Sequence, residues 1–508
     1  MYNLQLKMKK YIILCIIALL STTLYGQQPT ISQRLGDLET QRLIKVACIG
    51  NSVTYGYGHE NPDSTSYPSQ LAVMLGDDYE VGNFGKSGAT LLRKGHRPYN
   101  EQEEFKKALD FAPDIAIIHL GLNDTDPRNW KYYKREFISD YVALIEAFEK
   151  VNPDVEIYIC RMTPIFHWHH RFKKGTRDWY WEIQETIENI AENIAEVKLI
   201  DLQETLYHRP DLMPDALHPN PEGAKLIAQR VYSAITSNFG GLSVSRIYSD
   251  NMVIQRDKPF VVKGLANTGD EISVSLDKQK IKTEAGDDGR WEVTFDALKV
   301  DEKKHKLTIK SKDKTLSFKN IVVGEVILYS GNKISKDESQ KTKDFDHSTN
   351  NDIRLHYIDS DISSSWVKIE DIRSYDSMGE TLYDIGVKIS DSLQMPVGLI
   401  YNIVEDAPIE SFIDRKTLEW HPILIDVLYE WRNADNVKEH LDSNEPSYNY
   451  DKLIAPLSSF SINSVIWFED DTDSDSNTDT DSDLDSIKKS ALIESWKKVF
   501  GEISFILD

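Results

Sequence analysis

Two residues far apart in the chain, supported by a third, have the types that nucleophilic catalysis needs. Ser52 follows the apolar run that ends at Ile49-Gly50, on a turn that can present its hydroxyl at the end of a strand. His218 comes three residues after Asp215, so on a turn the carboxylate can reach the imidazole and fix which nitrogen carries the proton. A histidine held in this way can take the proton of a serine hydroxyl. We therefore predict a catalytic triad of Ser52, His218 and Asp215.

Attack of Ser52 on an ester carbonyl leaves a negative charge on the carbonyl oxygen, and three groups are candidates to stabilise it. One is the backbone N–H of Ser52 itself. Another is the backbone N–H of Gly85, because a residue without a side chain lets the backbone come close to a ligand. The third is the side-chain amide of Asn123. We expect them to form an oxyanion hole, in which the loss of one donor typically costs about 3 kcal/mol of barrier.

The elements that must position these residues are typical of an α/β domain, which we expect over residues 27–240. Predicted strands alternate with helical patterns such as 137–149 and 181–195. This alternation is typical of βαβ units and predicts a parallel sheet covered on both faces, with its functional residues at the carboxyl ends of the strands. The expected strands are 43–49, 79–83, 115–120, 155–160 and 197–202.

The combination resembles the SGNH, or GDSL-type, hydrolase superfamily. Ser52, Gly85, Asn123 and His218 match its four name-giving positions, and Asp215 matches its triad acid. The resemblance implies a flavodoxin-like αβα fold and esterase or lipase activity without a metal or other cofactor. One departure is Asn51, which stands where the usual pattern has Asp, so that support for the nucleophile turn must come from an amide.

Three stretches narrow the resemblance within this superfamily. Residues 46–56, 83–95 and 214–224 look like the branch of bacterial secreted esterases that remove acetyl groups from sugars. A lipase would need an apolar groove for the acyl chain, and the polar loops 61–66 and 93–104 do not indicate one.

The second half of the chain begins after Gly240-Gly241. Short alternating strands with turn signals predict a small β-sandwich over residues 241–320, and strands and helices mix again over 321–508. Four stretches in this half resemble the sialate O-acetylesterase family in order and spacing: 248–256, 289–291, 323–326 and 396–400.

Three parts of that second family are missing here. Lys333 stands where its nucleophilic serine belongs, and residues 469–472 replace a later Gly-Glu-Ser-Asn stretch. The sequence also stops at Asp508, before the segment that would hold the family's Asp-x-x-His. We therefore expect residues 321–508 to be a degenerate, truncated α/β esterase-like domain that either stabilises the protein or binds a glycan.

Two further segments have unusual composition. Residues 470–486 are crowded with Asp, Ser and Thr and contain no basic residue, which predicts a solvated acidic loop. Residues 166–170 contain three histidines, but adjacent histidines cannot easily reach one metal ion, so we expect a loop that lines the substrate site. Near it, Arg161, Arg171 or Arg177 could pair with a carboxylate on a sugar.

Charge and the start of the chain bear on its partners and its compartment. The 508 residues contain 59 Lys and Arg against 82 Asp and Glu, a net charge of −23, which repels nucleic acid. Lys7, Lys9 and Lys10 precede the apolar run 11–20 and small residues up to Gly26, which predicts a cleaved signal peptide over residues 1–26. We expect a secreted or periplasmic protein without a membrane span after cleavage.

These observations lead to one main functional hypothesis. The chain is expected to be a secreted serine esterase that removes O-acetyl groups from carbohydrates, with an O-acetylated glycan or sialic acid as substrate. Of the possible specificities, the second half favours one like that of sialate O-acetylesterases. The alternatives are a deacetylase of acetylxylan or another plant polysaccharide, and a glycan-binding protein without activity.

Overall fold

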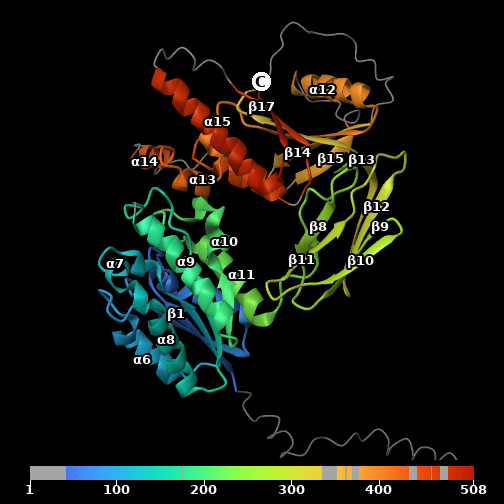
Figure 1. Ribbon diagram of the computed structural model, residues 1–508. Helices are drawn as coiled ribbons and strands as arrows, with labels where there is room; N and C mark the ends of the chain where they lie inside the picture. Colours follow the sequence, from blue (N-terminus) through green and yellow to red (C-terminus); the bar gives the residue numbers. More distant parts are fainter. Residues whose placement is uncertain are drawn as a thin grey trace, which may run out of the picture.

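The computed structural model describes the chain from residue 42 onward, apart from several short gaps (Figure 1). The predicted signal peptide, residues 1–26, lies outside the described residues. None of the helices in the described part of the chain is long and apolar enough to cross a membrane. The described ranges are 42–173, 175–333, 352–360, 363–368, 377–433, 443–458, 460–469 and 479–507.

The first half of the chain is built on a parallel sheet of five strands in the order β2-β1-β3-β4-β5. This order is that of flavodoxin-like folds, and it confirms the predicted α/β class and parallel sheet. The central strand, β3, is buried along its whole length because helices cover both faces of the sheet. The strands are β1 (Ile44–Gly50), β2 (Tyr79–Gly85), β3 (Ile115–His119), β4 (Glu156–Arg161) and β5 (Val197–Asp201).

The helices of this half cover both faces of the parallel sheet, as right-handed connections between its strands require. On one face α5 packs against α11, and on the other α6 packs against α8. Cys48 and Cys160, on β1 and β4, are buried free thiols and form no disulfide. The helices are α5 (Tyr67–Leu75), α6 (Glu103–Phe111), α8 (Phe137–Val151), α9 (Thr176–Asn193) and α11 (Pro221–Thr236).

Strands dominate the next part of the chain, as the sequence predicted. A small sheet in the order β11-β8-β6 faces the strands β10, β9 and β12 of a larger sheet (Figure 1). Alternate residues of β8, β9, β11 and β12 point inward and share one hydrophobic cluster. The bounds are β6 (Ser243–Val244), β7 (Val253–Gln255), β8 (Phe260–Leu265), β9 (Glu271–Leu276), β10 (Gln279–Glu284), β11 (Arg290–Phe295) and β12 (His305–Lys310).

One long strand, β13 (Thr315–Gly331), connects this part to the C-terminal part. Its first residues pair antiparallel with β12, and its later residues pair parallel with β16 and β17. The predicted boundary between residues 320 and 321 therefore falls inside a strand, and the domain limits remain predictions. Gly331 ends β13, and Asn332 and Lys333 follow it in the same way that Asn51 and Ser52 follow Gly50 at the end of β1.

The C-terminal part is a second arrangement of strands and helices. Its parallel strands lie in the order β14-β16-β13-β17-β18, with β15 antiparallel at one edge. The further bounds are β14 (Ile353–Ser360), β15 (Ser363–Lys368), α12 (Ser377–Leu393), β16 (Val397–Ile403), α13 (Arg415–Trp420), α14 (Ile425–Asn433), β17 (Ser464–Phe468), α15 (Asp479–Phe500) and β18 (Ser504–Leu507).

The predicted acidic loop over residues 470–486 is wrong for its second half. Helix α15 already begins at Asp479, while residues 470–478 lie outside the described residues. Leu484 and Ile487 pack on the hydrophobic cluster and extend the helical spacing of Ala491 upstream into the acidic run. Lys489 adds an ion pair with Asp485, one turn before it. Apolar spacing thus outweighs the high charge of these residues.

A buried ion pair joins the first half of the chain to the C-terminal part. Arg415, at the start of α13, donates to Asp451 Oδ2 at 3.0 Å and to the carbonyl of Tyr207 at 2.9 Å. His208 lies 2.5 Å from the other oxygen of Asp451. Both side chains of the Arg415–Asp451 pair are almost fully buried, at 1% and 2% exposure. The pair therefore fixes the end of α10 (Leu202–Tyr207) against α13.

We predict that Asp451→Ala strongly destabilises the protein, because it leaves the buried Arg415 guanidinium without a counter-charge. Breaking such a pair typically costs about 3–5 kcal/mol. The measurement is the guanidinium midpoint followed by tryptophan fluorescence. Glu271→Ala, which breaks an exposed pair with Lys282, is the control and is expected to leave the midpoint unchanged. Equal shifts for the two variants would contradict the structural role of the Arg415–Asp451 pair.

Candidate active site

The predicted nucleophile lies at the carboxyl end of β1, an inner strand of the sheet between β2 and β3. Ser52 is the first residue of the short helix α3 (Ser52–Tyr55), which follows directly after β1. Gly56 ends this helix in a left-handed conformation, with φ of 87°. The short turn leaves the Ser52 side chain half-buried at the edge of the sheet.

The structure brings the three predicted triad residues together. His218 Nε2 lies 2.8 Å from Ser52 Oγ, and His218 Nδ1 lies 2.6 Å from Asp215 Oδ2. The carboxylate thus holds the ring by one nitrogen and leaves the other to face the serine hydroxyl. This is the geometry in which an imidazole can act as a general base toward serine.

The turn that carries Asp215 and His218 is held in an uncommon backbone conformation. Ala216 is fully buried and has φ of 65°, a region that costs a residue with a side chain about 1–2 kcal/mol. Asp215 Oδ1 accepts the backbone N–H groups of Leu217 and His218, at 3.1 and 2.7 Å. The carbonyl of Ala216 accepts the N–H of Phe166 at 2.9 Å. These bonds fix the position of His218 relative to its acid.

The same hydrogen bonds control the charge of Asp215. Burial opposes ionisation, but the His218 imidazole and the backbone N–H groups outweigh it and lower the pKa of Asp215 to about 2. Because this pKa lies below that of an ordinary aspartate, the ionised group stabilises the fold above about pH 4 and loses that contribution as the pH falls toward 2. Asp215 therefore remains a carboxylate at neutral pH.

Two residues of the segment after Ser52 contact His218 or the residue that follows it. The ring of Tyr57 lies 4.6 Å from the ring of His218, centroid to centroid. His59 hydrogen-bonds to the carbonyl of Pro219 at 2.9 Å and to the Thr65 hydroxyl at 3.0 Å. The segment after the nucleophile thus contacts both His218 and the residue that follows it.

The side-chain amide of Asn51 supports the nucleophile turn, at the position where the usual pattern has Asp. Its Oδ1 accepts the N–H of Val53 at 3.0 Å and so caps α3. Its Nδ2 donates to the carbonyl of His119, at the end of β3, at 3.3 Å. An ionised aspartate has no proton to donate, so the amide links the nucleophile turn to β3 in a way that a carboxylate would not.

The predicted role of Gly85 as an oxyanion donor is contradicted by its geometry. Its N–H donates to the side-chain Oδ1 of Asn83 at 3.0 Å and is not available to a substrate. A Cβ at this position would lie 2.2 Å from the backbone nitrogen of Tyr55. Gly85 is therefore needed for the close approach of β2 to α3, which is a packing role.

Gly88, three residues later, is a better candidate and was missed. Within the described residues its N–H donates to no protein group, and its φ is 80°. It adjoins Ala89, whose carbonyl accepts a hydrogen bond from Asn123 Nδ2 at 3.0 Å. That bond uses one of the two amide protons of Asn123 and leaves the other. The available donors are thus the N–H groups of Ser52 and Gly88 and the Asn123 amide.

The residue next to Asn123 connects the two segments that carry the proposed oxyanion donors Gly88 and Asn123. Asp124 is fully buried and accepts the N–H groups of Leu91 and Leu92, at 2.9 and 2.8 Å. Burial raises its pKa to about 7, although these two N–H groups oppose the shift. Asp124 therefore holds the loop after β2, which contains Gly88, against the segment that carries Asn123.

The predicted histidine-rich loop lies beside this site. Burial, with the nearby His170 and Arg171, lowers the pKa of His169 to about 3, and the charges of Asp215 and His218 also act on it. His169 is thus neutral and close to the triad. Within the described residues no group of three His, Cys, Asp or Glu side chains is arranged to hold a metal ion.

The three arginines predicted to meet a carboxylate have different surroundings. Arg161 pairs with Glu188 at 2.9 Å and with Asp201 at 2.7 Å. Arg171 donates instead to Asn123 Oδ1, over a longer distance of 3.4 Å. Only Arg171 therefore contacts the predicted oxyanion hole.

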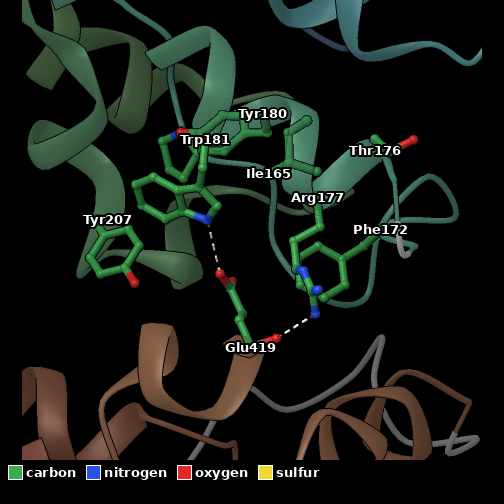
Figure 2. A pocket seen from close by; sticks show the side chains of 9 residues that line it. Ile165, Phe172, Thr176, Arg177, Tyr180, Trp181, Tyr207 and Glu419 are labelled. Atoms are coloured by element: carbon green, nitrogen blue, oxygen red, sulfur yellow. Dashed lines mark hydrogen bonds between the residues drawn. The ribbon is translucent and has the colours of Figure 1, made fainter. Parts of the chain in front are cut away.

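The third arginine, Arg177, takes part in a contact between the two halves of the chain. It donates to the backbone carbonyl of Glu419, and Trp181 Nε1 donates to the Glu419 carboxylate at 3.3 Å (Figure 2). Burial raises the pKa of Glu419 to about 7. These residues line a narrow pocket between α9 and α13 together with Ile165 and Phe172, which flank the histidine-rich loop on either side.

The comparison with known sequences identifies the domain that carries the site. Residues 48–226 match the GDSL-like Lipase/Acylhydrolase family. This part of the chain is a GDSL-like lipase/acylhydrolase domain. The match confirms the resemblance stated for the first half, whereas the degenerate esterase-like domain of the second half remains a prediction.

Several individual proteins are similar to parts of this chain. The acetylxylan esterase of Xylanibacter ruminicola is 35% identical over 215 residues, which cover 38% of this chain and 43% of that protein. The chain thus spans less than half the length of this relative. A carbohydrate acetylesterase from Xanthomonas citri aligns with a TM-score of 0.42 at 20% identity, over 52% of this chain and 59% of its own. For a family two carbohydrate esterase from Clostridium thermocellum the TM-score is 0.29 at 22% identity, over 38% and 63%.

We predict that Asp124→Asn impairs both the fold and the site. An asparagine can accept only one of the two N–H groups well, because its NH₂ would face the other donor, and a buried unpaired N–H costs about 1–3 kcal/mol. The shifted loop is expected to lower kcat on an acetyl ester by at least about tenfold. Urea denaturation and initial rates measure the two effects.

Asp140→Asn is the matched control for this prediction. Asp140 accepts one N–H of the same loop, that of Arg93, at 2.8 Å, but from the exposed side. Its replacement is expected to change stability and rate much less, because water can satisfy the freed N–H. Equal effects of the two substitutions would show that burial of Asp124 is not what holds the loop.

Proposed function

We propose that this protein is a serine ester hydrolase that removes O-acetyl groups from carbohydrates. The observation that carries the proposal is the pair of contacts of His218, 2.8 Å to Ser52 Oγ and 2.6 Å to Asp215 Oδ2, within a GDSL-like domain. The acetylxylan esterase relative, at 35% identity, supports an acetylated sugar as substrate.

The geometry gives each residue a step in the first half of the reaction. His218 Nε2 takes the proton of Ser52 Oγ as that oxygen bonds to the acetyl carbonyl carbon. The negative charge that develops on the carbonyl oxygen is stabilised by the N–H groups of Ser52 and Gly88 and by the Asn123 amide. His218 then gives its proton to the sugar oxygen, the ester C–O bond breaks, and the sugar leaves with a free hydroxyl.

Hydrolysis of the acetyl-serine completes the cycle with the same groups. His218 takes a proton from water, whose oxygen bonds to the acetyl carbon, and the oxyanion donors act again. The proton returns to Ser52 Oγ as acetate leaves. Asp215 stays ionised throughout and stabilises the imidazolium that forms twice in the cycle.

Two substrate classes follow from different parts of the chain. Acetylated xylan is favoured by the relative that matches the first half. O-acetylated sialic acid is favoured by the resemblance of the second half to sialate O-acetylesterases. Export through the predicted signal peptide over residues 1–26 would bring the enzyme to extracellular or periplasmic polysaccharide.

The test is hydrolysis of p-nitrophenyl acetate and p-nitrophenyl octanoate, followed by acetate release from acetylated xylan and from O-acetylated sialic acid. Acetate release from a sugar and preference for the short acyl chain are expected. Ser52→Ala should lower kcat by at least about 10³-fold, because the variant lacks the hydroxyl that forms the acyl-enzyme. The control Ser139→Ala, at an exposed serine of α8, should retain full activity.

Two results would overturn the proposal. Undiminished turnover by Ser52→Ala would place the chemistry elsewhere in the chain. Absence of turnover on every ester, together with glycan binding that Ser52→Ala leaves intact, would instead make the protein a glycan-binding module.

A further inference from the structure

Two arginines beside the oxyanion hole have no carboxylate partner within the described part of the chain. They are Arg171, directly after the histidine-rich loop, and Arg97, in the loop after β2. Acidic groups are plentiful in the chain as a whole, which has 82 acidic against 59 basic residues. Neighbouring arginines do find acids, as Arg161 does with Glu188 and Arg128 with Asp126.

Both guanidinium groups lie next to the residues proposed to bind the carbonyl oxygen. Arg171 Nη1 lies 3.4 Å from Asn123 Oδ1. Arg97 Nη1 donates to the carbonyl of Ser87 at 2.8 Å, and a Cβ on Gly88 would meet the same nitrogen at 3.2 Å. The hydrogen bond between Asn123 and Ala89 connects the residue beside Arg171 to the loop beside Arg97. The two positive charges therefore flank the oxyanion donors.

Most of the hydrogen-bonding capacity of these two groups is unused by the protein. A guanidinium has five N–H donors, and in the described residues each of the two uses one of them, to a neutral oxygen. Arg171 is also half-buried, and a desolvated guanidinium is stabilised best by a planar carboxylate that accepts two of its protons.

The other polar groups around Arg171 do not replace such a partner. Burial and the charges of Arg171 and Lys173 lower the pKa of His170, and His169 is kept neutral in the same way. His169 Nδ1 accepts the backbone N–H of Arg171 at 3.2 Å and so holds the chain at this residue without touching its charge. Lys173 adds a further exposed positive charge with no acidic partner in the described residues.

We propose that Arg171, assisted by Arg97, forms a subsite for the carboxylate of an acidic sugar. This inference rests on the proposed function and narrows it. The acetyl group to be removed would then stand on a sugar that itself carries a carboxylate, or on the sugar next to one. Uronic acids and sialic acids share this chemistry, whereas an unsubstituted xylan chain lacks it.

Calorimetry on the full chain tests the subsite without any turnover. Methyl glucuronoside, the methyl glycoside of N-acetylneuraminic acid and the neutral methyl glucoside are titrated separately, and the two acids distinguish the sources of the carboxylate. Saturable binding is expected for at least one acid and not for methyl glucoside. Arg171→Gln should weaken it about tenfold or more, and added salt should weaken it for the wild type.

Arg42→Gln is the matched control. It removes the same charge from a side chain that is 72% exposed and pairs with Asp114. Arg42 lies just before the start of β1, at the opposite end of this strand from Ser52. Equal binding of the acid and neutral sugars, or unchanged binding by Arg171→Gln, would overturn the subsite.

Kinetics separate recognition from any effect of Arg171 on Asn123. The measured quantity is the ratio of kcat/KM for an O-acetylated methyl glucuronoside to that for the matching methyl glucoside. The wild type should favour the acid about tenfold or more, and Arg171→Gln should bring the ratio close to one, with Arg171→Lys between them. Any general loss of esterase activity caused by a displaced Asn123 affects both substrates equally and therefore cancels in this ratio.

The two proposals fail in different ways. Hydrolysis of p-nitrophenyl acetate without any preference for acidic sugars would leave the esterase and refute the subsite. Binding of an acidic sugar that depends on Arg171, in a protein that hydrolyses no ester, would leave the subsite and refute the esterase.

Discussion

The hydrogen bond between His218 Nε2 and Ser52 Oγ joins residues that are 166 positions apart, and much of the first half of the chain maintains it. The parallel sheet places Ser52 at the end of β1, between β2 and β3. The turn from Asp215 to His218 accepts a strained Ala216 because Asp215 binds two backbone N–H groups there. The acid that orients the imidazole therefore also shapes the backbone that carries it. Removal of the Asp215 carboxylate would therefore change the position of His218 and also remove the negative charge beside its ring.

The second half of the chain contacts the site through the histidine-rich loop. Phe166 binds the Ala216 carbonyl through its N–H, and its ring lies 4.3 Å from the guanidinium carbon of Arg415. Arg415 in turn belongs to the buried pair with Asp451. The C-terminal part of the chain is thus in contact, through Arg415 and Phe166, with the turn that carries Asp215 and His218.

The sequence predicted the features that depend on local pattern and failed where a distant partner decides. Alternating strands and helices were enough for the parallel sheet and for the meeting of Ser52 and His218. The choice between Gly85 and Gly88 depended on the Asn83 side chain, which occupies the Gly85 N–H, and glycine spacing cannot reveal that. Helix α15 was missed because composition hid the apolar spacing of Leu484 and Ile487. The Arg415–Asp451 pair had no signal, because neither residue stands in a motif that indicates its partner.

The most direct test of the central claim is covalent labelling with a fluorophosphonate, because only an activated serine displaces fluoride from its phosphorus. Intact-mass and peptide mass spectrometry locate the label, and residual p-nitrophenyl acetate hydrolysis is followed in the same samples. The account predicts one label per chain, on the peptide that contains Ser52, with activity lost in proportion to labelling. Activity that persists in fully labelled protein, or a label on a different serine, would contradict it.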